Sequence, residues 1–85
     1  MRIDKYLKVS RLIKRRTIAK EIVDAGRVKI NGRAVKPGSE VKVGDVLEVG
    51  FGAKMVRAEV LEIRDSVRSE DAANMYRILD GEPID

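Results

Sequence analysis

The chain has 85 residues, of which 44% are hydrophobic and 38% are charged, with 18 Lys and Arg against 14 Asp and Glu. This length suits one domain with a small core, and the hydrophobic content is that of a globular protein. The absence of Cys and His removes disulfides, thiolate nucleophiles and the commonest general base. We therefore expect a binding protein that is not an enzyme and has no catalytic residue, cofactor or metal site.

Two short helices are predicted at the start of the chain. Over residues 3–10, Ile3, Tyr6, Leu7 and Ser10 recur at i, i+3, i+4 and i+7, which places Tyr6 in the core. A basic connection follows, in which Leu12 and Ile13 are candidate buried anchors. The second helix is expected over Ile18–Ala25, with Thr17 as its N-cap and Gly26 as its left-handed end. Its predicted buried stripe is Ile18, Ile22 and Ala25.

Strands are predicted in the middle of the chain. Residues 27–30 and 33–35 flank Asn31-Gly32, and this pair is a strong signal for a two-residue hairpin turn. Further strands are expected over residues 46–51 and 54–63, which are separated by the turn at Gly52-Ala53.

A third helix is predicted near the end. Ser69 is its candidate N-cap, and Ala72, Met75, Tyr76 and Leu79 recur at helical spacing. Residues 80–85 form an acidic end that we expect to be frayed. The predicted class is an α+β domain in which two short helices pack on a small antiparallel sheet, followed by a C-terminal helix.

The charge is distributed unevenly along the chain. Residues 1–36 hold twelve Lys and Arg against three Asp and Glu, whereas residues 37–85 hold six against eleven. A basic front half of this density suits phosphate oxygens, which Arg can bind in pairs and Lys as a point charge. The predicted RNA-binding residues are Arg2, Lys5, Lys8, Arg11, Lys14, Arg15, Arg16, Lys20, Arg27 and Lys29, which we expect to converge on one small volume. Asp4 is expected to favour the start of the first helix and to restrain Arg2 or Lys5.

RNA is the favoured ligand for this surface. The first two helices are too short, and their connection too long, for the usual readout of a DNA major groove, so no DNA partner is expected. Scarce aromatic residues argue against stacking on single strands. The N-terminus is charged, and nothing approaches the roughly 18 apolar residues of a membrane span, so we expect a cytoplasmic protein without a membrane partner.

Several motifs resemble a known family. Arg2-Ile3-Asp4-Lys5-Tyr6-Leu7, Arg15-Arg16-Thr17-Ile18-Ala19-Lys20, Gly26-Arg27-Val28 and Asn31-Gly32 resemble the alpha-L RNA-binding domain, the module named after ribosomal protein S-four. Phe51-Gly52, the strand around Val60-Leu61-Glu62 and Ala72-Ala73-Asn74-Met75-Tyr76 extend the resemblance to the RqcP (YabO) family of small stand-alone proteins. This family is related to the ribosome-associated 15-kilodalton heat-shock protein. The resemblance implies a single domain over 1–85, with the alpha-L motif in 1–48 and a strand-and-helix extension in 49–85.

The resemblance also implies a role in bacterial ribosome-associated quality control. Members of the family are understood to bind the obstructed large ribosomal subunit through ribosomal RNA and to stabilise its peptidyl-tRNA. An RqcH-type elongation factor on the same particle then adds alanine tails to the stalled chain. Carried over residue by residue, the family pattern makes Arg2 and Arg16 the first candidates for ribosomal RNA contacts, with Lys5, Arg15 and Lys20 beside them. The acidic end of this chain departs from the basic C-terminal extension of the heat-shock relative.

Three alternatives remain open from the sequence. A general RNA chaperone or subunit assembly factor would use the same surface without depending on peptidyl-tRNA. A targeting domain of an RNA-modifying enzyme would need a second domain. Attachment to anionic membranes would need an exposed aromatic or Leu-rich helix face.

Overall fold

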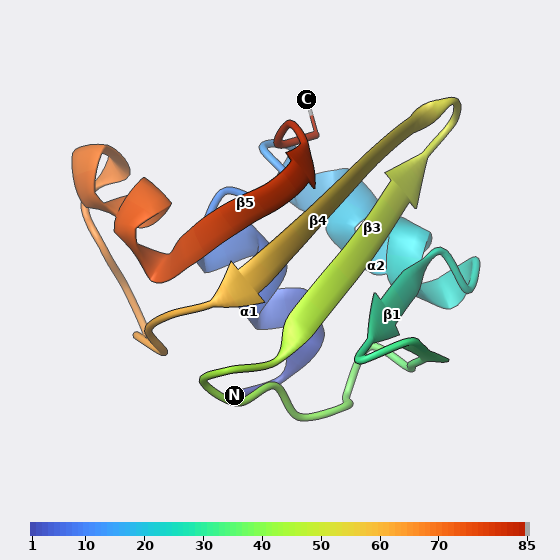
Figure 1. Ribbon diagram of the computed structural model, residues 1–85, viewed down its shortest axis with the longest axis horizontal. Helices are drawn as coiled ribbons and strands as arrows, with labels where there is room; N and C mark the ends of the chain where they lie inside the picture. The colour runs from blue at the N-terminus through green and yellow to red at the C-terminus, as the bar shows by residue number, and fades with distance from the viewer. Residues whose placement is uncertain (85) are drawn as a thin grey trace.

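A five-stranded antiparallel sheet with two short helices across one face makes up the protein (Figure 1). The computed structural model describes residues 1–84, and at position 16 only the backbone. The elements are α1 (Ile3–Val9), α2 (Arg16–Asp24), β1 (Val28–Ile30), β2 (Arg33–Ala34), β3 (Val46–Phe51), β4 (Lys54–Val60), the 3-10 helix η1 (Ser69–Met75) and β5 (Tyr76–Gly81). The strands lie in the order β2-β1-β3-β4-β5. This architecture confirms the predicted α+β class.

Helix α1 packs its predicted apolar stripe against the sheet. Ile3, Tyr6, Leu7 and Ser10 are all fully buried. The hydroxyl of Tyr6 donates a 2.8 Å hydrogen bond to the carbonyl oxygen of Met75, at the end of η1. Burial raises the pKa of Tyr6 well above its usual value, with Tyr76 and Glu62 adding to the shift. Tyr6 is therefore a neutral core residue, as predicted, and it links α1 to the last third of the chain.

Helix α2 begins earlier than predicted. Arg15 occupies the N-cap position with an extended backbone and no side-chain cap, so Thr17 lies inside the first turn and the prediction of Thr17 as N-cap is wrong. The buried positions are Ala19, Ile22 and Val23, whereas Ala25 is exposed. Of the predicted stripe, Ile22 is buried and Ile18 packs partly buried against the core, so only Ala25 is wrong, because contact with the sheet selects Ala19 and Val23 as the other buried positions. Gly26 has a φ of +74° and ends the helix as expected.

The turn between β1 and β2 follows the prediction. Asn31 and Gly32 both have positive φ, 52° and 84°, and Ile30 lies opposite Arg33. The Asn31 side chain also joins the hairpin to β3: its Oδ1 accepts the Val46 N–H at 2.9 Å and its Nδ2 donates to Asp45 at 3.0 Å. The Asn residue thus forms the turn and fixes the start of the next strand.

The structure corrects the predicted last helix. Helical backbone stops at Met75, and Tyr76 starts β5, which pairs with β4. Ala72 and Met75 are buried, but Leu79 is 41% exposed, so the apolar stripe ends where the strand begins. Without β5, β4 would carry a row of unpaired backbone groups, and pairing with β5 satisfies them.

The end of the chain is anchored, against the prediction of a frayed tail. Ile84 is fully buried, its N–H donates to the carbonyl oxygen of Leu12 at 2.8 Å, and its own carbonyl oxygen accepts the Lys14 N–H at 2.8 Å. Position 85 lies outside the described residues. The last residues therefore brace the connection between α1 and α2.

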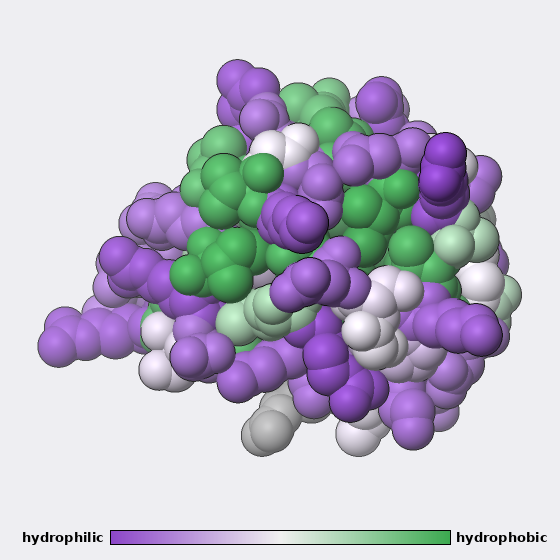
Figure 2. All heavy atoms as spheres, turned by 90° about the horizontal axis from the view of Figure 1, so that it is seen from below, coloured by the Kyte–Doolittle hydropathy of each residue, from purple (hydrophilic) through white to green (hydrophobic). Residues whose placement is uncertain are grey.

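One face of the molecule is largely polar (Figure 2). Figure 2 shows hydrophilic side chains over most of one face, with hydrophobic residues gathered between them. The large hydrophobic residues with exposed surface are Val43, Phe51, Met55, Leu61, Ile78 and Leu79. Among the residues that the structure describes, no helix is long and apolar enough to span a membrane.

Candidate nucleic-acid interface

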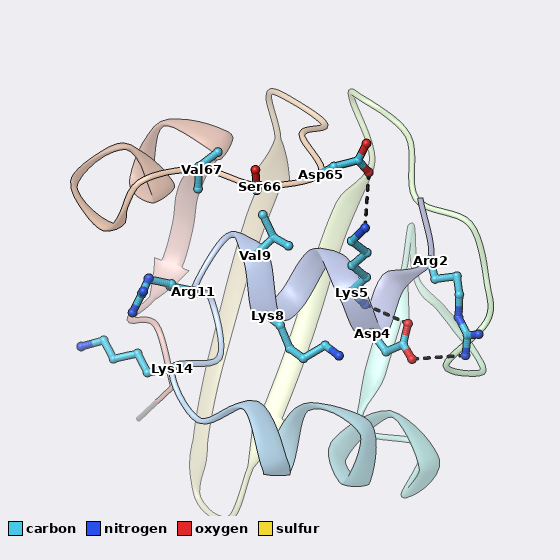
Figure 3. A pocket seen from close by; sticks show the side chains of 10 residues that line it. All are labelled: Arg2, Asp4, Lys5, Lys8, Val9, Arg11, Lys14, Asp65, Ser66 and Val67. Carbon is cyan, nitrogen blue, oxygen red and sulfur yellow. Dashed lines mark hydrogen bonds and ion pairs between the residues drawn. The ribbon is translucent and has the colours of Figure 1, made fainter.

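A groove of about 720 Å³ runs along α1 and gathers many of the predicted cationic residues (Figure 3). We call it the α1 groove. It is lined by Arg2, Asp4, Lys5, Lys8, Val9, Arg11, Lys14, Asp65, Ser66 and Val67. One wall is α1 with the connection that follows it, and the other is the linker between β4 and η1. Parts of the chain some 60 residues apart therefore form one surface.

The helical repeat of α1 sets the cations along the groove. Arg2, Lys5 and Lys8 follow at intervals of three, so they share one face of the helix. Tyr6 and Leu7 are buried on the opposite side. The cations are thus mounted on a helix that the core holds in place.

The connection after α1 adds two more cations by a backbone reversal. Arg11 adopts a φ of 58°, a left-handed conformation that is uncommon outside glycine, and its N–H donates to the Lys8 carbonyl oxygen at 3.2 Å. Leu12 and Ile13, directly after it, are buried, which confirms them as anchors. Arg11 and Lys14 stay exposed and line one end of the groove, whereas Arg2 lies at the other end (Figure 3).

Two carboxylates stand among these five cations. Asp4 Oδ2 lies 3.2 Å from Arg2 Nη2, and Asp4 Oδ1 accepts the backbone N–H of Lys5 at 2.8 Å. This confirms that Asp4 supports the helix start and restrains Arg2. Asp65, on the linker, lies 3.4 Å from Lys5 Nζ, and its side chain is 92% exposed. Five cations against two carboxylates leave the groove positive, which suits a phosphate backbone.

Arg27 and Lys29 lie elsewhere, so the prediction that the cations converge on one volume is wrong for these two. They line a separate hollow of about 180 Å³ beside β3. Arg27 Nη2 donates to the Gly52 carbonyl oxygen at 3.0 Å, and its guanidinium covers Gly50, where a Cβ would lie 2.7 Å from Nη2. Lys29 lies opposite Glu48 in the β1–β3 register. Contacts within the sheet thus engage the Arg27 side chain.

The remaining predicted residues lie on α2 and at its N-cap. Arg15 and Lys20 are exposed and do not line the α1 groove. The backbone of Arg16 begins α2, and its side chain lies outside the described part of the structure.

Sequence reasoning missed the linker wall of Asp65, Ser66 and Val67. Residues 64–68 lack apolar periodicity, which is typical of an exposed connection. No local pattern indicates that this connection passes over α1, because β4 and η1 determine its path.

Comparison with known proteins gives the class of the fold. The S4 domain family matches residues 1–47. Heat Shock Protein 15 of Vibrio cholerae has a similar structure, with a TM-score of 0.82 and 30% identity over 92% of this chain and 80% of that one. The solution structure of the hypothetical protein HP1423 gives a TM-score of 0.78 and 31% identity over 96% of this chain and 100% of that one. The fold is thus that of an S4-domain protein.

Relatives found by sequence identify a particular family among the S4-domain proteins. The RQC P-site tRNA stabilizing factor of Bacillus subtilis is 57% identical over 84 residues, which are 99% of this chain and 98% of that protein. The protein of the same name from Streptococcus pneumoniae is 56% identical over 79 residues, 93% of this chain and 90% of its own length. The chain belongs to this family of S4-domain proteins.

Proposed function

We propose that the protein acts in bacterial ribosome-associated quality control, where it binds the obstructed large ribosomal subunit and stabilises the retained peptidyl-tRNA. The observation that carries this proposal is the α1 groove, which gathers five cations in a chain 57% identical to an RQC P-site tRNA stabilizing factor. Holding the tRNA in place would allow an RqcH-type elongation factor on the same particle to add alanine tails to the stalled chain.

The proposed mechanism is docking of a rigid cationic face on RNA. Arg2, Lys5 and Lys8 project from a helix whose other side is buried, so the backbone that carries them loses little conformational freedom when phosphates bind. Arg can hold two phosphate oxygens at once, whereas Lys acts as a point charge. A face that contacts ribosomal RNA and tRNA together limits the freedom of the tRNA to shift or dissociate.

The proposed contact residues divide into two groups. Arg2, Lys5, Lys8, Arg11 and Lys14 contact RNA from the α1 groove, and Arg15, Arg16 and Lys20 do so from α2 and its N-cap. Arg27 and Lys29 lie outside these groups and contribute less.

The protein works as a single domain over 1–85 and as a binding factor without catalysis, in the cytoplasm. Supporting this, Tyr6 in the S4-matched part bonds to Met75 beyond it, so one core spans both parts.

The test is retention of peptidyl-tRNA on purified large subunits. We expect the full chain to pellet with subunits that carry peptidyl-tRNA in preference to vacant ones, and to slow loss of the tRNA. Arg2→Ala should reduce both effects. Equal binding to vacant and obstructed subunits, without slower tRNA loss, would overturn the quality-control role in favour of a general ribosome-associated factor.

A further inference from the structure

We propose that Asp4 is a positioning residue, which holds the Arg2 guanidinium in place for a phosphate contact at the end of the α1 groove. This inference rests on the proposed function of the groove. Asp4 would then help the protein to bind a polyanion, although the negative charge of Asp4 alone would oppose that binding.

The backbone around Arg2 is fixed by a neighbouring turn. The Ile3 N–H donates to the Ser39 carbonyl oxygen at 2.8 Å, the Asp4 N–H donates to the Pro37 carbonyl oxygen at 3.3 Å, and Arg2 forms a β-bridge with Glu40. The Cα of Arg2 therefore has a defined place at the groove end, and what remains free is the long side chain.

The side chain is held between Asp4 and the same turn. Asp4 Oδ2 lies 3.2 Å from Arg2 Nη2, and a Cβ at position 38 would lie 3.9 Å from that Nη2, so the guanidinium passes close to Gly38. The Asp4 side chain is only 15% exposed, and its second oxygen is held by the Lys5 N–H at 2.8 Å. Arg2 is 62% exposed, which leaves guanidinium donors open to a ligand.

Asp65, the second carboxylate of the groove, serves as the control residue for Asp4. It also pairs with a groove cation, Lys5 at 3.4 Å, but it is 92% exposed and lies on the linker. A carboxylate in that setting acts on a bound polyanion mainly through its charge. Removing either acid changes the net charge equally, so opposite effects of Asp4→Asn and Asp65→Asn on affinity isolate positioning from charge.

The experiment measures affinity of the labelled full chain for large ribosomal subunits that carry peptidyl-tRNA, over a series of salt concentrations. Asp4→Asn keeps an oxygen for the Lys5 N–H but loses the ionic hold on Arg2. We expect it to weaken binding about three- to tenfold, because an unrestrained Arg must lose rotamer freedom on binding. Asp65→Asn should bind more tightly than the parent. In an Arg2→Ala background, Asp4→Asn should cause no further loss.

Each outcome decides a separate point. If Arg2→Ala weakens binding while Asp4→Asn binds as tightly as the parent, the positioning role of Asp4 is wrong and the groove function stands. If Asp4→Asn weakens binding equally with and without Arg2, its effect is structural and the inference is overturned. If Arg2→Ala binds normally, Arg2 is not an RNA contact, and both the inference and that part of the proposed function are lost. Circular dichroism checks folding, and Asp4→Ser, which also keeps a side-chain oxygen, replaces Asp4→Asn should the latter unfold.

Discussion

Replacing Tyr6 with phenylalanine is expected to lower the free energy of unfolding by about 1 kcal/mol, within the range for loss of one buried hydrogen bond. The Tyr6 hydroxyl donates to the Met75 carbonyl oxygen at 2.8 Å. That oxygen also accepts the N–H groups of Leu61 at 2.8 Å and Glu62 at 3.1 Å. The substitution therefore leaves no unpaired acceptor in the core, so the larger penalty of an unsatisfied buried group does not apply.

The assay is thermal and urea unfolding of the full chain. For a domain of this size, a loss of about 1 kcal/mol lowers Tm by roughly 4–8 °C. Tyr76→Phe is the matched control, because it makes the same chemical change on a half-buried ring, and it should shift Tm less. A Tyr6→Phe protein as stable as the parent would refute the contribution of this bond. A loss above about 3 kcal/mol would refute the reasoning about the shared acceptor.

The same hydroxyl predicts how stability depends on alkaline pH. The pKa of Tyr6 is raised above 10.0 in the folded protein, mainly by burial, so the folded state keeps a proton that the unfolded chain releases. The folded state then binds more protons than the unfolded state, and stability falls as pH rises. The stability that the folded state gains from the neutral Tyr6 hydroxyl is fully present below about pH 10 and is lost as the pH rises above that value. Tyr6→Phe should lessen the fall in Tm above that pH, and an unchanged fall would contradict the assignment.

Three further predictions concern the groove and the chain end. Asp65→Asn should tighten binding to obstructed subunits by up to about fivefold at low salt, since an exposed ion pair is worth about 0.2–1 kcal/mol. Asp80→Asn makes the same charge change on β5 and should have less effect. Equal gains in affinity from the two substitutions would show that net charge alone is responsible. Arg11→Ala should weaken the same binding by about 1 kcal/mol or more, whereas Lys29→Ala should alter it little. If a pelleting assay shows a larger loss for Lys29→Ala than for Arg11→Ala, the RNA binds the face of the sheet that carries Lys29, and the assignment of the α1 groove is wrong. Ile84→Ala should cost about 2–5 kcal/mol in urea unfolding, as truncation of a buried Ile does, and a negligible loss would show that the chain end is not anchored.

Local patterns accounted for the elements whose geometry depends on a few adjacent residues. Asn31-Gly32 needed only two residues that tolerate positive φ, and the structure has both. The stripe of Ile3, Tyr6 and Leu7 likewise needed only the helical repeat. The same repeat sets Arg2, Lys5 and Lys8 on one face of α1.

Long-range contacts decided the elements that were predicted wrongly. Ala72, Met75, Tyr76 and Leu79 satisfy a helical repeat, but the open edge of β4 takes Tyr76 into a strand. Asp65 meets Lys5 across 60 positions of sequence, and Ile84 bonds to Leu12 across the molecule. No window of a few residues carries such pairings, and this is why the linker wall and the anchored end were missed.

The most direct test of the central claim is a cryo-electron microscopy structure of the full chain on a large subunit that carries peptidyl-tRNA. We predict that the α1 groove faces RNA backbone, with Arg2 and Lys8 within hydrogen-bonding distance of phosphate oxygens, and that the protein contacts ribosomal RNA and the tRNA together. A complex in which the RNA meets the opposite face of the sheet, around Lys29 and Glu48, with the α1 groove open to solvent, would contradict the account.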